Sequence, residues 1–101
     1  MPDADYERCR FSITCHTTDV AVLHCLRSLC ELHVVGCPKQ IGWGGSTQAS
    51  WRSTQNCVTF RFTSPADRDA FAQDANRLLV SASWREVSRR DDDPARRQRV
   101  G

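Results

Sequence analysis

The sequence predicts one α+β domain in which two helices pack against a sheet. Three observations lead to this class: stretches in which apolar and polar residues alternate, two longer stretches in which apolar residues recur every three or four positions, and a length of 101 residues. Alternation is typical of a half-buried strand, and the longer spacing is typical of an amphipathic helix. A chain of this length holds one modest core and leaves no room for a second domain.

The first strand and the first helix are predicted between residues 8 and 35. Apolar residues alternate with polar ones over residues 8–17, which predicts a strand that buries Phe11, Ile13 and Cys15. Thr17, Thr18 and Asp19 offer N-cap oxygens to a helix that is expected to run from about Asp19 to Val35. Gly36 and Pro38 follow in the order that usually ends a helix. The polar residues 1–7 are expected to be flexible.

The least regular stretch lies between Ile41 and Asn56. Three glycines surround Trp43, and glycine within a strand usually marks a bulge or a close approach of two backbones. Residues 48–53 are placed to pair with the strand that follows, across a turn at 53–56. We therefore expect a kinked second strand here.

The clearest strand and helix come next. Val58, Phe60 and Phe62 alternate with polar residues over 57–63, which predicts a third strand with these three side chains in the core. Ser64 and Pro65 then form a strong helix start, with serine at the N-cap and proline at the first helical position. The second helix is expected to end near residue 79 and to bury Phe71, Ala75 and Leu78.

A fourth strand is predicted from Val80 to about Ser88, because Val80, Ala82 and Trp84 alternate with polar residues. Residues 89–101 contain few apolar side chains and are expected to be a disordered charged tail. The order βαββαβ folds most simply into the ferredoxin-like sandwich: four antiparallel strands in the order 4-1-3-2, with both helices on one face. The folded domain is expected to span residues 8–88 and to leave the other sheet face open.

The segment CVTFRFTSPADRDAFA, from Cys57 to Ala72, resembles the third strand and second helix of the RNA recognition motif. In that family the third strand presents stacking aromatic rings on the open face. Here the corresponding positions hold Cys57 and Thr59, which cannot stack on a base, while Phe60 and Phe62 have the parity of the core side. The resemblance therefore implies a shared fold rather than an RNA-stacking surface.

The open face of the predicted sheet is expected to carry arginines. The side chains with outward parity are Arg8 and Arg10 on the first strand, Arg61 on the third and Arg85 on the fourth. Guanidinium groups bind carboxylates and phosphates through forked hydrogen bonds, so such a cluster predicts a binding surface. The alternative is a solvated polar face that only keeps the protein soluble.

Trp43 and Trp51 are the other candidates for partner binding. Tryptophan is enriched at interface hot spots, and neighbouring glycines allow the backbone of a partner to come close. A domain this small also needs large aromatic side chains to close its core. We expect one of the two to be exposed and the other to be buried.

A metal site is the alternative reading of Cys30, His33 and Cys37, with Cys25 or His24 as a fourth ligand. Zinc prefers thiolate and imidazole ligands. The set contains no paired Cys-x-x-Cys, however, and its cysteines fit the apolar stripe of the first helix equally well. We therefore expect core packing here, with a histidine favoured at the helix end, and no metal or other cofactor.

Catalytic machinery is not expected. Cys15 and His16 are neighbours in sequence, but on a strand their side chains point to opposite faces and cannot form a dyad. The glycines around Trp43 lack the following lysine and the strand-to-helix context of a phosphate loop. The carboxylates of the predicted helices are most simply solvated.

The charge balance and the cysteine content limit the classes of partner and compartment that we expect. Fourteen basic and twelve acidic residues give a net charge of +2. A charge this small predicts no strong electrostatic attraction to nucleic acid. Thirteen of the basic residues are arginine, a bias that suggests a GC-rich bacterial or phage genome. Six cysteines without an export signal or a long apolar segment predict reduced thiols, a cytoplasmic location and no membrane contact.

These observations predict a non-catalytic binding or regulatory module, such as an inhibitor, that engages a protein through the arginines and the Trp43 to Trp51 segment. A nucleic-acid-binding domain that uses the same arginines on phosphates is the alternative, and a zinc-binding protein is the third reading. Phosphate binding weakens steeply with salt, which separates the first two. A homodimer through the second strand or the open face is also compatible with the sequence.

Overall fold

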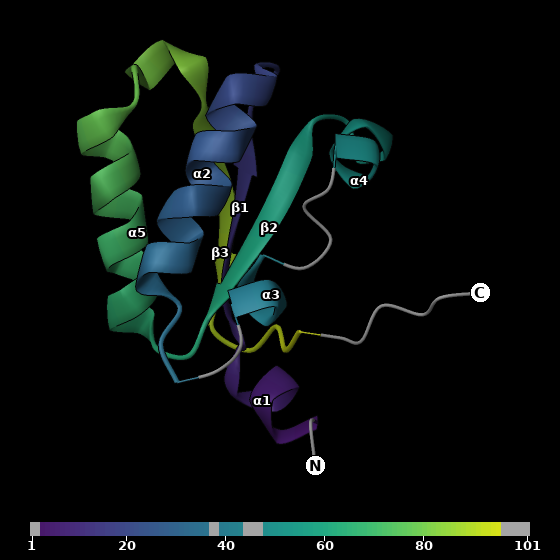
Figure 1. Cartoon of the computed structure of the whole chain (residues 1–101), viewed down its shortest axis with the longest axis vertical. Helices are drawn as coiled ribbons and strands as arrows, with labels where there is room; N and C mark the ends of the chain where they lie inside the picture. Colours follow the sequence, from purple (N-terminus) through teal and green to yellow (C-terminus); the bar gives the residue numbers. More distant parts are fainter. Residues whose placement is uncertain (1–2, 37–38, 44–47, 96–101) are drawn as a thin grey trace.

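The computed structural model describes residues 3–36, 39–43 and 48–95, and these form two layers, one of strands and one of helices (Figure 1). The strands β1 (Phe11–His16), β2 (Cys57–Phe62) and β3 (Arg85–Arg90) make an antiparallel sheet in the order β2-β1-β3. The long helices α2 (Val20–His33) and α5 (Pro65–Leu78) pack against each other and against the sheet. The class is therefore α+β, with β1 as the central strand.

The predicted four-stranded sheet is wrong: the described part of the chain contains three strands. Residues 48–53, expected to form the second strand, form the short helix α4 (Gln48–Ser53), and α3 (Lys39–Gly42) precedes it. Residues 44–47 lie outside the described residues. The α4 sequence QASWRS has one strand-favouring residue, and helical geometry turns that residue, Trp51, into the core. Both short helices contact β2 on the edge where a fourth strand would pair (Figure 1).

The two long helices begin as the sequence predicts. The Asp19 carboxylate accepts a hydrogen bond from the backbone N–H of Ala21 at 2.9 Å, and the Ser64 hydroxyl accepts one from the N–H of Asp67 at 3.1 Å. Each bond satisfies an N–H that has no carbonyl partner within its own helix. The predicted helix starts are confirmed.

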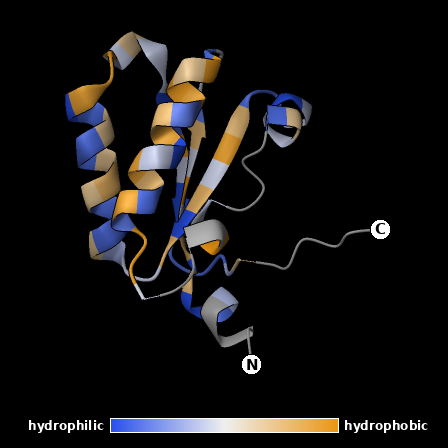
Figure 2. Ribbon diagram, in the orientation of Figure 1, coloured by the Kyte–Doolittle hydropathy of each residue, from blue (hydrophilic) through white to orange (hydrophobic). Residues whose placement is uncertain are grey.

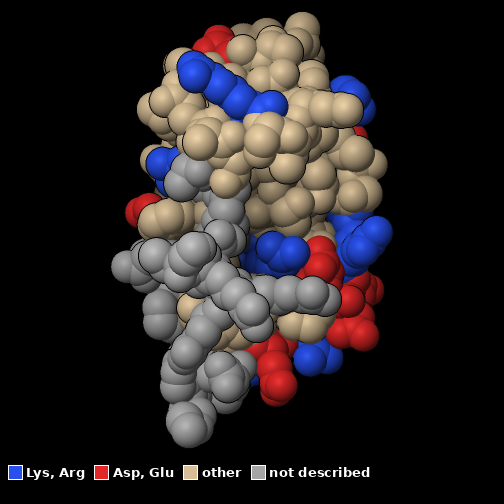
Figure 3. Space-filling view, turned by 90° about the vertical axis from the view of Figure 1, so that its right-hand side faces the viewer, with Lys and Arg blue, Asp and Glu red and all other residues tan. Residues whose placement is uncertain are grey.

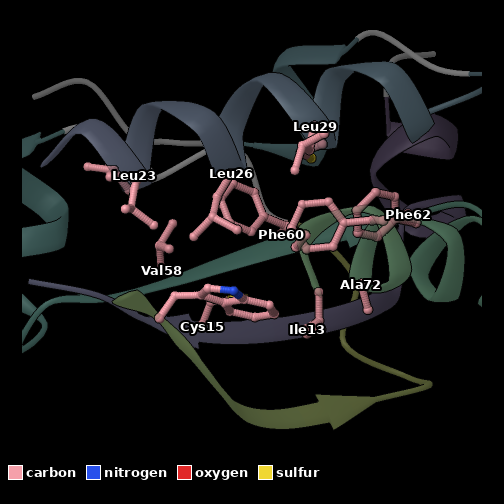
Figure 4. Close-up of a cluster of buried hydrophobic side chains, with 14 of the residues drawn as sticks. Ile13, Cys15, Leu23, Leu26, Leu29, Val58, Phe60, Phe62 and Ala72 are labelled. Carbon is pink, nitrogen blue, oxygen red and sulfur yellow. The ribbon is translucent and has the colours of Figure 1, made fainter. Parts of the chain in front are cut away.

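The core lies between the helices and one face of the sheet (Figure 4). Cross-strand pairing sets Ile13 opposite Phe60 and Cys15 opposite Val58, and all four are buried. Leucines of α2 point down onto these residues, and the Phe71 ring of α5 lies 5.3 Å from that of Phe60 between centroids. The predicted parity of the first and third strands is therefore confirmed.

The predicted fourth strand begins later than expected. Residues 81–83 form a short 3-10 helix, η1 (Ser81–Ser83), and Val80 is 73% exposed rather than buried. Strand β3 starts after Trp84, and all six of its residues are exposed. Its pairing with β1 shifts register between Thr14 and Cys15, which marks a bulge.

Both ends of the described chain pack at the lower end of β1 in Figure 1. Residues 3–8, expected to be flexible up to residue 7, form the helix α1 (Asp3–Arg8). Beyond β3, the backbone N–H groups of Asp93 and Ala95 donate to the carbonyls of Arg10 and Cys9 at 2.8 and 3.0 Å. Ala95 is buried in a small cluster with Cys9 and Ile41. Residues 96–101 of the predicted tail lie outside the described residues.

Candidate functional site

The sheet face opposite the long helices is the surface that the sequence singled out, and we call it the open face. Register defines its members, because Ser12, Thr14 and His16 of β1 have the parity opposite to the core residues; Thr14 and His16 are half-buried, and Ser12 is buried. Their cross-strand partners complete it: Cys57, Thr59 and Arg61 on β2, and Arg85, Ser88 and Arg90 on β3. The hydroxyls of Thr14 and Thr59 are hydrogen-bonded to each other at 2.8 Å. No member is Phe, Tyr or Trp, so the face offers mainly hydrogen bonds and positive charge.

The predicted position of Arg8 is wrong. Arg8 belongs to α1 rather than to the first strand, and its guanidinium donates to the carbonyl of Gly36 at 2.6 Å. The sequence reason is that strand alternation begins only at Phe11, after the chain has left α1. Arg8 therefore joins α1 to the end of α2 and takes no part in the open face.

Arg10 and Arg61 lie where the C-terminal segment crosses the sheet, and both meet acids there. The Arg10 Nη1 lies 3.4 Å from an Asp92 oxygen, and the Arg61 Nη2 lies 3.2 Å from an Asp93 oxygen. Burial alone would raise the pKa of Asp93, but Arg61, a hydrogen bond with Ser12 and the charge of Arg90 together hold that pKa below its ordinary value. Figure 3 shows acidic and basic side chains side by side in the lower part of this view. These two arginines are thus already neutralised.

Arg85 and Arg90 differ from Arg61 and from Arg10, which precedes β1. Within residues 3–36, 39–43 and 48–95, their guanidinium groups form no hydrogen bond and no ion pair. Both are exposed, and they stand at opposite ends of β3. The positive charge that the open face presents to solvent is therefore concentrated on β3.

A separate charged network holds β3 to α5 on the helix side of the sheet. Arg68 is buried and its Nη1 donates to Asp91 at 2.6 Å. Arg89 donates to Asp69 at 2.6 Å and to Glu86 at 2.7 Å. No local pattern predicts this network, because its members come from two elements that meet only in the folded protein. These charges stabilise the fold and are turned away from the open face.

Of the two tryptophans, Trp51 is buried as one of them was expected to be, but Trp43 is half-buried rather than exposed. Trp51 is 4% exposed, and its indole Nε1 donates to the carbonyl of Thr17 at 2.9 Å. Trp43 is half-buried and lies under the Arg27 guanidinium, 5.5 Å from the ring centroid. Its assignment to partner binding is wrong for Trp51, because helical geometry directs that ring inward, and it stays a prediction for Trp43.

The residues of the alternative metal site are engaged elsewhere. Cys30 is fully buried in the core, and His33 is hydrogen-bonded to an Asp74 carboxylate oxygen at 2.7 Å. Hydrogen bonds from Arg77 and then from His33 lower the pKa of Asp74. Cys37 lies outside the described residues. Among those that are described, no three potential ligands lie close enough to hold a metal ion.

An apolar groove between α2 and α5 was missed by the sequence analysis. It has a volume of about 370 Å³ and is lined by His24, Cys25, Ser28, Leu29, Leu78 and Leu79. Leu78, expected in the core, is 58% exposed, and the end of α5 is the hydrophobic stretch visible in Figure 2. The sequence feature that could have revealed the groove is the apolar run Leu78-Leu79-Val80. Three consecutive apolar residues cannot all lie on one stripe of a helix.

The buried thiols are unsuited to nucleophilic attack. Burial raises the pKa of Cys15 to about 12, with Glu86 adding to the effect, so the thiol is neutral at physiological pH. His16 lies on the other face of β1, as its parity predicts, and its neighbour across the strands is Cys57.

In the part of the chain that the structure describes, the helices are too short and too polar for a membrane span. Comparisons of the chain with models of protein families, with curated proteins and with solved structures find no match.

Proposed function

We propose that this chain is a non-catalytic binding or regulatory module, of which an inhibitor is one kind, and that its open face engages an acidic segment of a protein partner. The observation that carries the proposal is that Arg85 and Arg90 lie on one face of one strand and that neither guanidinium forms an ion pair among the described residues. At about 3.3 Å per residue, their backbones are about 16 Å apart. That separation suits an extended segment with two acidic side chains better than a single small ion.

The polar groups between the two arginines favour hydrogen bonding to such a segment. Ser88 is exposed on β3, and Thr14 and His16 lie beside it on β1. A polar face without large apolar anchors supports transient rather than obligate association. A reversible regulatory contact is consistent with this composition.

Nucleic acid is the less favoured partner for two reasons. The open face has no Phe, Tyr or Trp ring on which a base could stack. Its Arg61 and the neighbouring Arg10 are neutralised by Asp93 and Asp92, and Asp91 is adjacent to Arg90. Affinity for nucleic acid depends on the number of phosphates that a protein neutralises, and carboxylates at the same end reduce that number.

The same proposal places the chain in the cytoplasm. All five cysteines that the structure describes are free thiols, which is the state that a reducing compartment maintains. A homodimer through the predicted second strand is not proposed, because residues 48–53 form the helix α4 and offer no strand edge there.

Site-specific photo-crosslinking tests the proposal. A photoreactive amino acid replaces Ser88 on the open face, and a matched variant carries it in place of the exposed Gln73 on α5. Both proteins are irradiated in a lysate of the source cells, treated with nuclease and analysed by mass spectrometry. We expect a protein adduct at position 88 that is absent at position 73 and is lost when Arg85→Gln and Arg90→Gln are combined.

Three outcomes would overturn the proposal. A nuclease-sensitive adduct at position 88 would favour the nucleic-acid alternative, and an adduct between two copies of the chain would favour self-association. Equal adducts at positions 88 and 73 would mean that the open face has no special affinity.

A further inference from the structure

A small pocket adjoins the open face where β1 ends and β3 begins. It has a volume of about 200 Å³ and is lined by His16, Thr17, Thr18, Ala82, Ser83, Trp84 and Arg85. His16 and Arg85 are cross-strand partners on the same face, so their side chains approach the pocket from neighbouring strands. None of the lining residues is acidic.

Three of the lining side chains have donor groups that are not in use. Within the described ranges, His16, Thr18 and Arg85 make no side-chain hydrogen bond and no ion pair. By contrast, Arg10, Arg61 and the arginines that hold β3 to α5 all have acidic partners. A guanidinium, an imidazole and a hydroxyl that converge without an acid among them are the groups that bind an oxyanion.

The wall of the pocket is fixed by hydrogen bonds rather than by loose loops. Thr17 is buried, and its hydroxyl donates to the Ser83 carbonyl at 2.7 Å, which holds η1 against the start of α2. Its own backbone is held on both sides: the N–H donates to Asn56 at 3.1 Å, and the carbonyl accepts from the Trp51 indole. The backbone wall of the pocket is thus held in place before a ligand binds.

We propose that this pocket binds the oxyanion of a small ligand or terminal group, either phosphate or carboxylate, through Arg85, His16 and Thr18. A volume of about 200 Å³ is below the range of roughly 300 to 1,000 Å³ that is common for drug-sized ligands, so it suits one such group rather than a whole cofactor. The inference does not rest on the proposed function, because the pocket can bind a small anion in the absence of any protein partner, although Arg85 and His16 belong to the open face as well.

The test is a titration of the isotope-labelled protein, followed by backbone amide NMR. One arm uses sodium phosphate and the other sodium acetate, each at ionic strength held constant with sodium chloride. We expect saturable shifts confined to residues 16–18 and 82–85, with a dissociation constant on the order of 1 mM. The arm with the tighter binding identifies the group that the pocket prefers.

Matched variants distinguish specific anion binding in the pocket from nonspecific attraction to positive charge. Arg85→Gln is expected to weaken binding about tenfold, which corresponds to the loss of one charge-assisted hydrogen bond, while Arg85→Lys keeps most of it. Arg90→Gln removes the same charge from the other end of β3 and is expected to leave the titration unchanged. Shifts that do not saturate with either anion, or equal effects of Arg85→Gln and Arg90→Gln, would overturn the inference.

If the anion binds and no crosslink forms at position 88, the pocket stands and the protein-binding proposal fails. If the crosslink forms and neither anion binds, the protein-binding proposal stands and the pocket proposal fails.

Discussion

Thr17 connects more parts of the molecule than any other residue described above. Its backbone and hydroxyl join the end of β1 to the turn before β2, to α4, to the start of α2 and to η1. Thr17 itself is buried, so a Thr17 group that loses its partner becomes a desolvated donor or acceptor. The pocket wall therefore depends on the Thr17 hydroxyl, and the position of α4 depends on the Thr17 backbone carbonyl.

Thr17→Val is nearly isosteric and removes only the hydroxyl. The Ser83 carbonyl and the Asp19 N–H each lose a partner, and we expect the free energy of unfolding to fall by about 1–3 kcal/mol. Urea denaturation measures the change. Thr18→Val is the control, because Thr18 is exposed and without a hydrogen bond in the described part of the chain, so its effect should stay within about 0.5 kcal/mol. Equal losses in the two variants would refute the role assigned to Thr17.

The ion pair between Asp93 and Arg61 predicts a pH dependence. Because the pKa of Asp93 is lowered in the folded protein, its stabilising contribution is complete above the ordinary pKa of about 4 and is lost as the pH falls through the lower folded value. For a partly exposed pair the contribution is at most about 1 kcal/mol.

Measurement of the unfolding free energy from neutral to acidic pH tests this dependence. The wild type should be more stable than Asp93→Asn near neutral pH, and the difference should close on acidification. A difference that stays constant across the range would show that the Asp93 charge does not stabilise the fold.

At the scale of elements, the decisive feature is the helix α4 on the edge of β2. A strand there would have turned alternate side chains of residues 48–53 outward, whereas the helix directs one large side chain, Trp51, into the core and leaves Arg52 and Ser53 in solvent. The opposite edge, β3, is protected differently. Its exposed residues are mostly charged and its pairing is bulged, and both features discourage the addition of another strand.

Two buried tryptophans allow the hydrogen bond that anchors α4 to be measured. The Trp51 indole donates to Thr17, whereas the Nε1 of Trp84 is buried without a hydrogen-bond partner among the described residues. Replacement by phenylalanine removes the same volume from each site. We expect Trp51→Phe to cost about 1 kcal/mol more than Trp84→Phe in thermal or chemical unfolding. An equal or larger loss for Trp84→Phe would contradict the anchoring role.

At the scale of the whole molecule, the sequence predicted what depends on local pattern. The caps at Asp19 and Ser64, the two long helices and the inward parity of Phe60 and Phe62 all follow from periodicity and capping chemistry. It failed over residues 41–56, where a short apolar signal around one tryptophan fits a strand and a helix equally well. There the structure has a tertiary hydrogen bond from Trp51 to Thr17 that local periodicity does not predict.

The sequence predicted which face of the sheet carries the arginines of the candidate site, but not which of them form ion pairs. Strand parity placed Arg61 and Arg85 on one face correctly. Parity says nothing, however, about which arginines meet acids, because Asp92 and Asp93 reach the sheet only through the path of the C-terminal segment. The pocket beside His16 needed the position of η1, which was expected to be a strand.

The two faces of the sheet are the basis of the whole account, and the native cysteines report on them directly. We expect brief alkylation of the folded protein, mapped by peptide mass spectrometry, to modify the exposed Cys25 and the half-buried Cys57 of the open face. Cys15, together with Cys9 and Cys30, should be protected until the protein unfolds, because all three are fully buried. Modification of Cys15 as fast as Cys57 would mean that the faces are assigned the wrong way round.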